Sequence, residues 1–178
     1  MSLKKDKIIA TFFIIALCFL FHFMYEWFPN KLFAIFFPVN ESIWEHMKIL
    51  FSSICFYGII DYIILHKNNI KVNNYIFSIF APTILSIIIY LIIFLPVYNI
   101  IGENMIFSIT LMIIVIIISQ LISYYILNMK QIKYINIISF LLIIISYIIF
   151  GYLTYNPIHN YIFFDSHHNV YGINDYNI

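Results

Sequence analysis

The stretch Asn40-Glu41-Ser42-Ile43-Trp44-Glu45-His46 opens the second of five long apolar runs in this chain. It brings two carboxylates and an imidazole to the start of a segment that is otherwise hydrocarbon-like, and Lys48 follows two residues later. Ionisable groups in such segments are costly, and they usually face the interior of a helix bundle or a water-filled cavity. The stretch therefore marks the start of a membrane-spanning helix and one part of a candidate site.

The composition of the chain indicates a membrane protein. Of its 178 residues, 63% are hydrophobic and only 10% are charged, whereas a soluble domain has about 25% charged residues. So few charges cannot cover the surface of a soluble domain, so the lipid bilayer is the expected partner. All nine basic residues are lysines, which argues against a guanidinium clamp and against nucleic acid as a partner.

The apolar runs predict an all-α, integral membrane helical bundle of about five transmembrane helices. Each run is long enough to cross about 30 Å of hydrocarbon as a helix. A single membrane domain, residues 1–178, is expected, because the length leaves no room for a second one. The predicted helices cover about residues 8–28, 43–65, 75–98, 105–127 and 134–155, and a polar tail, residues 156–178, follows them.

The lysines predict the orientation of the bundle. Seven lysines fall at one end of the five runs and two, Lys31 and Lys48, at the other. Cytoplasmic loops of membrane proteins carry the excess of lysine and arginine. The sequence thus predicts a multi-pass protein of the cytoplasmic membrane, with the N-terminus in the cytoplasm and the C-terminal tail outside.

With this orientation, most acids and histidines collect on the outer half of the membrane. They are six of the eight acids (Glu26, Glu41, Glu45, Glu103, Asp165 and Asp175) and five of the six histidines (His22, His46, His159, His167 and His168). Asp61 lies near the inner end, where Lys67 or water is its expected partner. One polar pocket is expected, open to the outer face and lined by the first two helices and the tail.

Imidazole and carboxylate together are the ligand set of zinc and of other divalent first-row metals. The expected ligands are His46, His159, Asp165 and His167, with His22 as a reserve. A catalytic zinc leaves one position open for a water molecule, which it acidifies. The expected general base is Glu45 or Glu41, and the other pocket residues are Glu26, Asn40, Ser42 and Lys48.

Structural roles are the alternatives for these residues. Ser42 and Glu45 fit a helix capping box, and His22 and Glu26, four residues apart, fit a hydrogen-bonded pair that ties the first helix to a neighbour. Lys48 either extends to the membrane interface or neutralises a nearby carboxylate. A His-Glu-x-x-His motif is absent, so the metal hypothesis depends on the joint placement of these groups.

The stretch from Asn40 to His46 resembles the Asn-Glu-Ser-Ile/Val-Trp-Glu-His signature of a family of small bacterial multipass membrane proteins of unknown function. The tail, from Pro157 through Phe164-Asp165 to Tyr171-Gly172-Ile173, is similar to the ending of that family. The resemblance implies an integral protein of the bacterial cell envelope and specifies no activity.

Three functions are compatible with this pattern. The leading hypothesis is a metal-dependent hydrolase that acts on a lipid or envelope substrate from the outer face. The second is a subunit that binds or transports a cation or small solute, in which a carboxylate such as Glu26 carries the ion. The third is a structural membrane protein in which the polar groups only tie helices and tail together. A carrier needs polar groups through the full thickness of the membrane. On the inner half the sequence offers only Asp61, Gln120 and scattered Ser and Thr, which favours a pocket on one side.

Overall fold

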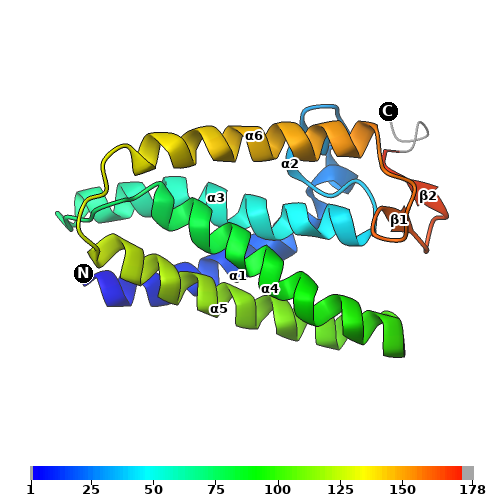
Figure 1. Ribbon diagram of the computed structural model, residues 1–178, viewed down its shortest axis with the longest axis horizontal. Helices are drawn as coiled ribbons and strands as arrows, with labels where there is room; N and C mark the ends of the chain where they lie inside the picture. Colours follow the sequence, from blue (N-terminus) through cyan, green and yellow to red (C-terminus); the bar gives the residue numbers. More distant parts are fainter. Residues whose placement is uncertain (1, 174–178) are drawn as a thin grey trace.

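The computed structural model describes residues 2–173, and Figure 1 shows five long helices and a small hairpin at one end. The long helices are α1 (Leu3–Trp27), α3 (Ile43–Lys67), α4 (Phe77–Ile101), α5 (Met105–Asn128) and α6 (Ile135–Tyr155). Each of them is long and apolar enough to cross a membrane. The predicted all-α membrane bundle is therefore confirmed. The end of the predicted tail, Asp175 included, lies outside the described residues.

The chain turns at the two ends of the bundle, which we call the N-terminal end and the tail end (Figure 1). The N-terminal end holds the start of α1 and the connections α3–α4 and α5–α6. The tail end holds the short helix α2 (Phe33–Phe36), the start of α3, the α4–α5 turn and the hairpin of β1 (Phe164–Asp165) with β2 (Val170–Tyr171). The predicted orientation across the membrane stays a prediction.

Most helix bounds agree with the prediction within two residues, but α1 begins five residues earlier than expected. The side chain of Ser2 caps this helix by accepting the backbone N–H of Lys5 at 3.4 Å, as small hydroxyl residues do at helix starts. The extra turn is packed into the bundle, since Asp6 and Lys7 are buried. Because α1 starts early, two ionisable side chains, those of Asp6 and Lys7, lie inside the protein.

Helix α4 covers residues 77–101 instead of the predicted 75–98. Its first residues lack a capping side chain of their own. Instead, the side-chain oxygen of Asn136, on α6, accepts the N–H groups of Ile76 and Phe77 at 3.0 and 3.3 Å. A cap supplied by another helix cannot be recognised from local sequence, so the predicted start was displaced.

The helices pack in pairs around an apolar core. Helix α1 packs mainly against α3, α4 against α5, and α6 against α2 and α4. Ile14, Phe51, Val115 and Ile116 are completely or almost completely buried where these pairs meet. Since α1 and α3 lie side by side along their length, polar side chains at both ends of this interface come together.

The tail folds back onto the start of α3. The backbone N–H of Trp44 donates to the carbonyl of Ile162 at 2.9 Å, and the side-chain amide of Asn40 donates to the carbonyl of Gly172 at 2.8 Å. The N–H of Ile173 donates to the carbonyl of Thr154, at the end of α6, at 3.2 Å. These bonds bring together the two segments that carry the family resemblance.

Replacing Gly172 with alanine is expected to lower the free energy of unfolding by about 1–3 kcal/mol, because the backbone there is left-handed and costs other residues about that much. Its φ is +59°, and a Cβ atom would press on the Thr154 carbonyl and lie 2.9 Å from Cγ of Pro157. Gly172→Asn is the comparison, since asparagine tolerates a left-handed backbone better than alanine but adds the same Cβ. Thermal unfolding in detergent measures both variants, and wild-type stability in Gly172→Asn would contradict the role of the clash.

Candidate functional site

Three side chains gather at the tail end and form what we call the His22 cluster: His22 on α1, Glu41 just before α3, and His46 on α3. Oε1 of Glu41 lies 3.7 Å from Nε2 of His22, and Oε2 lies 3.2 Å from Nε2 of His46. One ligand atom from each residue lies within 4.8 Å of the other two. The three side chains are 29%, 36% and 33% exposed, so the cluster is reachable from solvent.

The start of α3 aims His46 into this cluster. Ser42 is the N-cap of α3, and its hydroxyl accepts the N–H of Glu45 at 3.3 Å. The serine half of the predicted capping box is thus confirmed, whereas the Glu45 carboxylate bonds to Val39 and Thr154 instead of the Ser42 N–H. Asn40 holds the cap in place, because its side-chain oxygen accepts the N–H of Ser42 at 2.9 Å. The carbonyl of Ser42 in turn lies 2.9 Å from Nδ1 of His46.

This last contact determines which ring nitrogen of His46 carries the proton. A carbonyl oxygen only accepts hydrogen bonds, so Nδ1 is assigned as the donor from its partner. In the neutral ring, Nε2 then presents a lone pair to the Glu41 carboxylate, and two acceptors at 3.2 Å repel each other unless a proton or a metal ion joins them. Metal-bound histidines commonly donate their other ring N–H to a carbonyl in this way.

Glu41 is held in its ionised form. Contact with His46 holds the pKa of Glu41 below its usual range, and the nearby His22 adds to this, although partial burial and Asp165 act in the opposite direction. An ionised carboxylate is the form that binds a metal ion. The cluster therefore offers two imidazoles and one carboxylate anion.

Asp165 anchors the tail to Glu41. Its buried carboxylate accepts the N–H of Glu41 at 3.0 Å, the N–H groups of His167 and His168 at 2.8 and 3.1 Å, and Nδ1 of His168 at 2.8 Å. Burial alone would raise the pKa of Asp165, but these hydrogen bonds hold it below its usual range. Asp165, a predicted ligand, thus positions the backbone of Glu41 and already has partners on both oxygens.

The other two predicted ligands of the tail lie outside the His22 cluster. Nε2 of His167 lies 2.8 Å from Oε2 of Glu103, on the α4–α5 turn, and this contact raises the pKa of His167. The ring of His159 stacks on Tyr171, with 4.5 Å between ring centroids. The structure therefore brings together His46, the reserve ligand His22 and the predicted base Glu41. The four-ligand set that joins His46 to the tail is not assembled among the described residues.

The second predicted base, Glu45, is closed off from the cluster by a buried ion pair with Lys48. Lys48 also donates to the Ala34 carbonyl and the Thr154 hydroxyl, both at 2.8 Å. Glu45 accepts the Thr154 hydroxyl at 2.8 Å and the Val39 N–H at 3.0 Å. This network joins α2, α3 and α6, and it leaves Glu45 too buried to receive a proton from solvent.

Glu26 is a candidate for the role of general base, which the buried Glu45 cannot fill. It is exposed and lies one helical turn beyond His22 on α1. Its charge acts on the His22 imidazole, as the four-residue spacing predicts. Glu26 was predicted to be one of the other pocket residues, without a catalytic role.

The five apolar spans define a multi-pass membrane protein, and its candidate site is a histidine–carboxylate cluster at the tail end. Residues 1–173 match the model of DUF6512, a family of unknown function, and the chain belongs to this family. Membership of a family of unknown function was predicted and is confirmed, while the role of the Asn40–His46 stretch as a family signature stays a prediction. No curated protein matches the chain. No solved structure matches it either.

Proposed function

We propose that this protein binds a divalent first-row metal ion, zinc foremost, at His22, Glu41 and His46, and uses it to hydrolyse a lipid or envelope substrate. The observation that carries the proposal is the placement of two imidazoles against one carboxylate: Nδ1 of His46 contacts the Ser42 carbonyl, which leaves its Nε2 facing Glu41 at 3.2 Å. In place of a proton between Nε2 and the carboxylate, a metal ion would bind both groups.

The geometry suits zinc. Zinc binds histidine and carboxylate at about 2.0–2.2 Å, so neighbouring ligand atoms of a tetrahedral site lie roughly 3.3 Å apart. Oε2 of Glu41 lies 3.2 Å from Nε2 of His46, close to this separation, and the other oxygen, Oε1, lies 3.7 Å from Nε2 of His22. Two histidines and one glutamate are also a ligand set of catalytic zinc sites, in which water takes the fourth position. The partial exposure of all three side chains allows water to reach that position.

A lipid or envelope substrate follows from the place of the cluster. It lies at one end of the apolar helices, where lipid headgroups meet water. Exposed aromatic side chains follow His22 along α1, namely Phe23, Trp27 and Phe28, and aromatic residues are typical of the membrane interface. A bound zinc would lower the pKa of its water, and Glu26, exposed beside His22, would accept the proton.

Hydrolysis of phospholipid vesicles by the purified protein tests this function. We expect release of headgroup or fatty acid that stops when a chelator removes the metal and returns when zinc is added. Glu26→Gln should lower the rate about 10²–10⁴-fold and leave the metal content unchanged. If the protein binds zinc but hydrolyses none of the lipids offered, the metal site remains supported and the hydrolase function is refuted.

A transport function is the second candidate, and one observation favours it. The same α1–α3 interface carries another polar cluster at the N-terminal end, with Asp6, Lys7 and Asp61, which was not expected from the sequence. A carrier would have to open this interface, because the apolar side chains of Ile14 and Phe51 are buried between the two ends. Zinc uptake into sealed vesicles, without lipid hydrolysis, would favour this candidate.

A further inference from the structure

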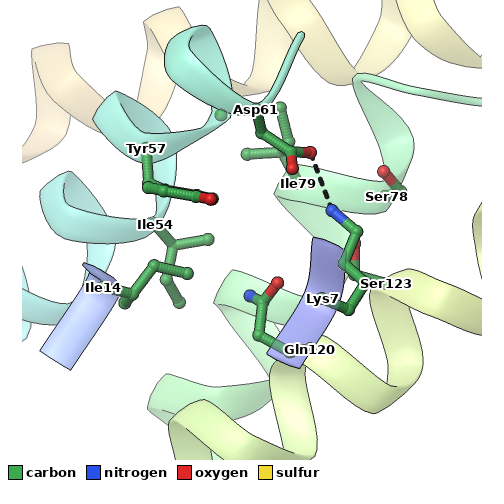
Figure 2. A pocket seen from close by; sticks show the side chains of 10 residues that line it. Lys7, Ile14, Ile54, Tyr57, Asp61, Ser78, Ile79, Gln120 and Ser123 are labelled. Carbon is green, nitrogen blue, oxygen red and sulfur yellow. Dashed lines mark hydrogen bonds and ion pairs between the residues drawn. The ribbon is translucent and has the colours of Figure 1, made fainter. Parts of the chain in front are cut away.

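A buried cluster of charges lies at the N-terminal end, far from the His22 cluster. Nζ of Lys7 lies 2.7 Å from Oδ2 of Asp61 and 3.8 Å from Oδ2 of Asp6 (Figure 2 shows the Lys7–Asp61 bond). Asp6, Lys7 and Asp61 are 0%, 7% and 2% exposed. The predicted pairing of Asp61 with Lys67 is wrong, because the early start of α1 places Lys7 beside α3.

The hydrogen bonds of this cluster are incomplete in a way that points to a proton. Both carboxylate oxygens of Asp6 and Oδ1 of Asp61 are buried and have no hydrogen-bond partner among the described residues. Oδ2 of Asp61 and Oδ2 of Asp6 both lie within 3.8 Å of the same ammonium nitrogen, Nζ of Lys7. A carboxylate that is buried without hydrogen bonds is far more costly in its ionised form than in its protonated form, so Asp6 is the acid that takes up a proton.

The charges around the pair lead to the same conclusion. Lys7 on α1 is the cation facing the two carboxylates, and the other polar groups that line the adjacent cavity or bond to Asp61 are neutral: Tyr57 on α3, Tyr75 before α4, Ser78 on α4, and Gln120 and Ser123 on α5. One ammonium group compensates one carboxylate. A second buried carboxylate without a counter-charge is strongly unfavourable, and it takes up a proton instead.

The space beside the pair is too small for a larger ligand. A cavity of about 10 Å³ lies against Lys7, Tyr57 and Asp61 (Figure 2). Such a volume holds about one water molecule. The ammonium of Lys7 already occupies the cation position next to Asp61, so a hydrated metal ion has no room here. The Tyr57 hydroxyl, which has no hydrogen-bond partner among the described residues, also faces this cavity.

We propose that Asp6 and Asp61 form a proton-binding site, in which Asp6 carries one proton and Lys7 neutralises the charge of Asp61. The site is independent of the proposed metal function. With the proton bound, the three groups together are neutral, and without it they carry one negative charge. Proton binding therefore controls the charge of the α1–α3 interface at the N-terminal end.

Infrared spectroscopy of the purified protein tests the site directly, since a protonated carboxylic acid has a carbonyl stretch that ionised carboxylates lack. At neutral pH we expect this band in the wild type, shifted in heavy water. It should be lost in Asp6→Asn and in Asp61→Asn, where the remaining acid ionises to pair with Lys7. Glu103→Gln, a control at an exposed acid, should keep it. Absence of the band from the wild type, or its persistence in both variants, would overturn the proposal.

Thermal unfolding provides a second measurement. Asp6→Asn replaces a neutral acid with a neutral amide of nearly the same shape, so the melting temperature at neutral pH should stay within about 2 °C of the wild type. If Asp6 were instead an ionised partner of Lys7, the substitution would break a buried ion pair and lower the melting temperature by roughly 10 °C. That loss would refute protonation of Asp6.

Discussion

Replacing Lys48 with methionine is expected to lower the free energy of unfolding by about 3–5 kcal/mol, because it leaves a buried carboxylate without its counter-charge. Lys48 and Glu45 are 0% and 1% exposed. The substitution also removes donors from the Ala34 carbonyl and the Thr154 hydroxyl. Denaturant or thermal unfolding in detergent measures the effect.

Two further variants show whether the loss comes from the unpaired charge. Lys31→Met makes the same change at an exposed lysine, and it should alter stability by less than about 0.5 kcal/mol. The double variant Glu45→Leu, Lys48→Met removes both charges, so it should recover much of the loss, as buried pairs replaced by apolar side chains often do. Equal effects of Lys31→Met and Lys48→Met would refute the buried pair.

Replacing His46 with alanine is expected to weaken zinc binding at least about 100-fold, because even the partners of metal ligands contribute 10–100-fold to affinity. The affinity is measured by competition with a chromophoric chelator, with protein that has been stripped of metal. His22→Ala should have an effect of similar size, since its Nε2 faces the other oxygen of Glu41.

His159→Ala is the matched control for this experiment. His159 was an expected ligand, but in the structure it stacks on Tyr171, so its removal should leave zinc affinity within about threefold, well below the effect of a ligand. A large loss of affinity in His159→Ala, with little change in His46→Ala, would show that the tail histidines hold the metal. Absence of zinc binding by the wild type would remove the metal site altogether.

The five spans were predictable because hydropathy acts locally. A run of about 20 apolar residues reads as a span whatever its neighbours are, and the five predicted runs correspond to the five long helices. The start of α3 was predictable for the same reason, since Ser42 caps a helix whose first turn follows it directly. The start of α1 was displaced because the prediction began at the apolar run and missed the cap by Ser2, and the start of α4 was displaced because its cap, Asn136, lies on another helix.

The candidate site was predicted only in part. His46 and Glu41 lie on one short stretch, so their closeness followed from the sequence, and their meeting with His22 followed from placing both segments at the same end. The tail residues could not be assigned in this way. The turn that follows Asp165 directs backbone N–H groups onto its carboxylate, and no pattern of residue types shows that both oxygens are already bonded.

The sequence by itself determined the class of the protein, its number of spans and the end of the bundle at which histidines and acids collect. Only the tertiary structure decided which polar and charged side chains pair with one another. Lys7 pairs with Asp61 across 54 residues of chain, and Thr154 bonds to Glu45 across 109 residues. The physical reason is range: hydropathy and capping depend on neighbours within a few residues, whereas a pair between helices depends on the rotation and axial position of each helix, which the packing of the whole bundle sets.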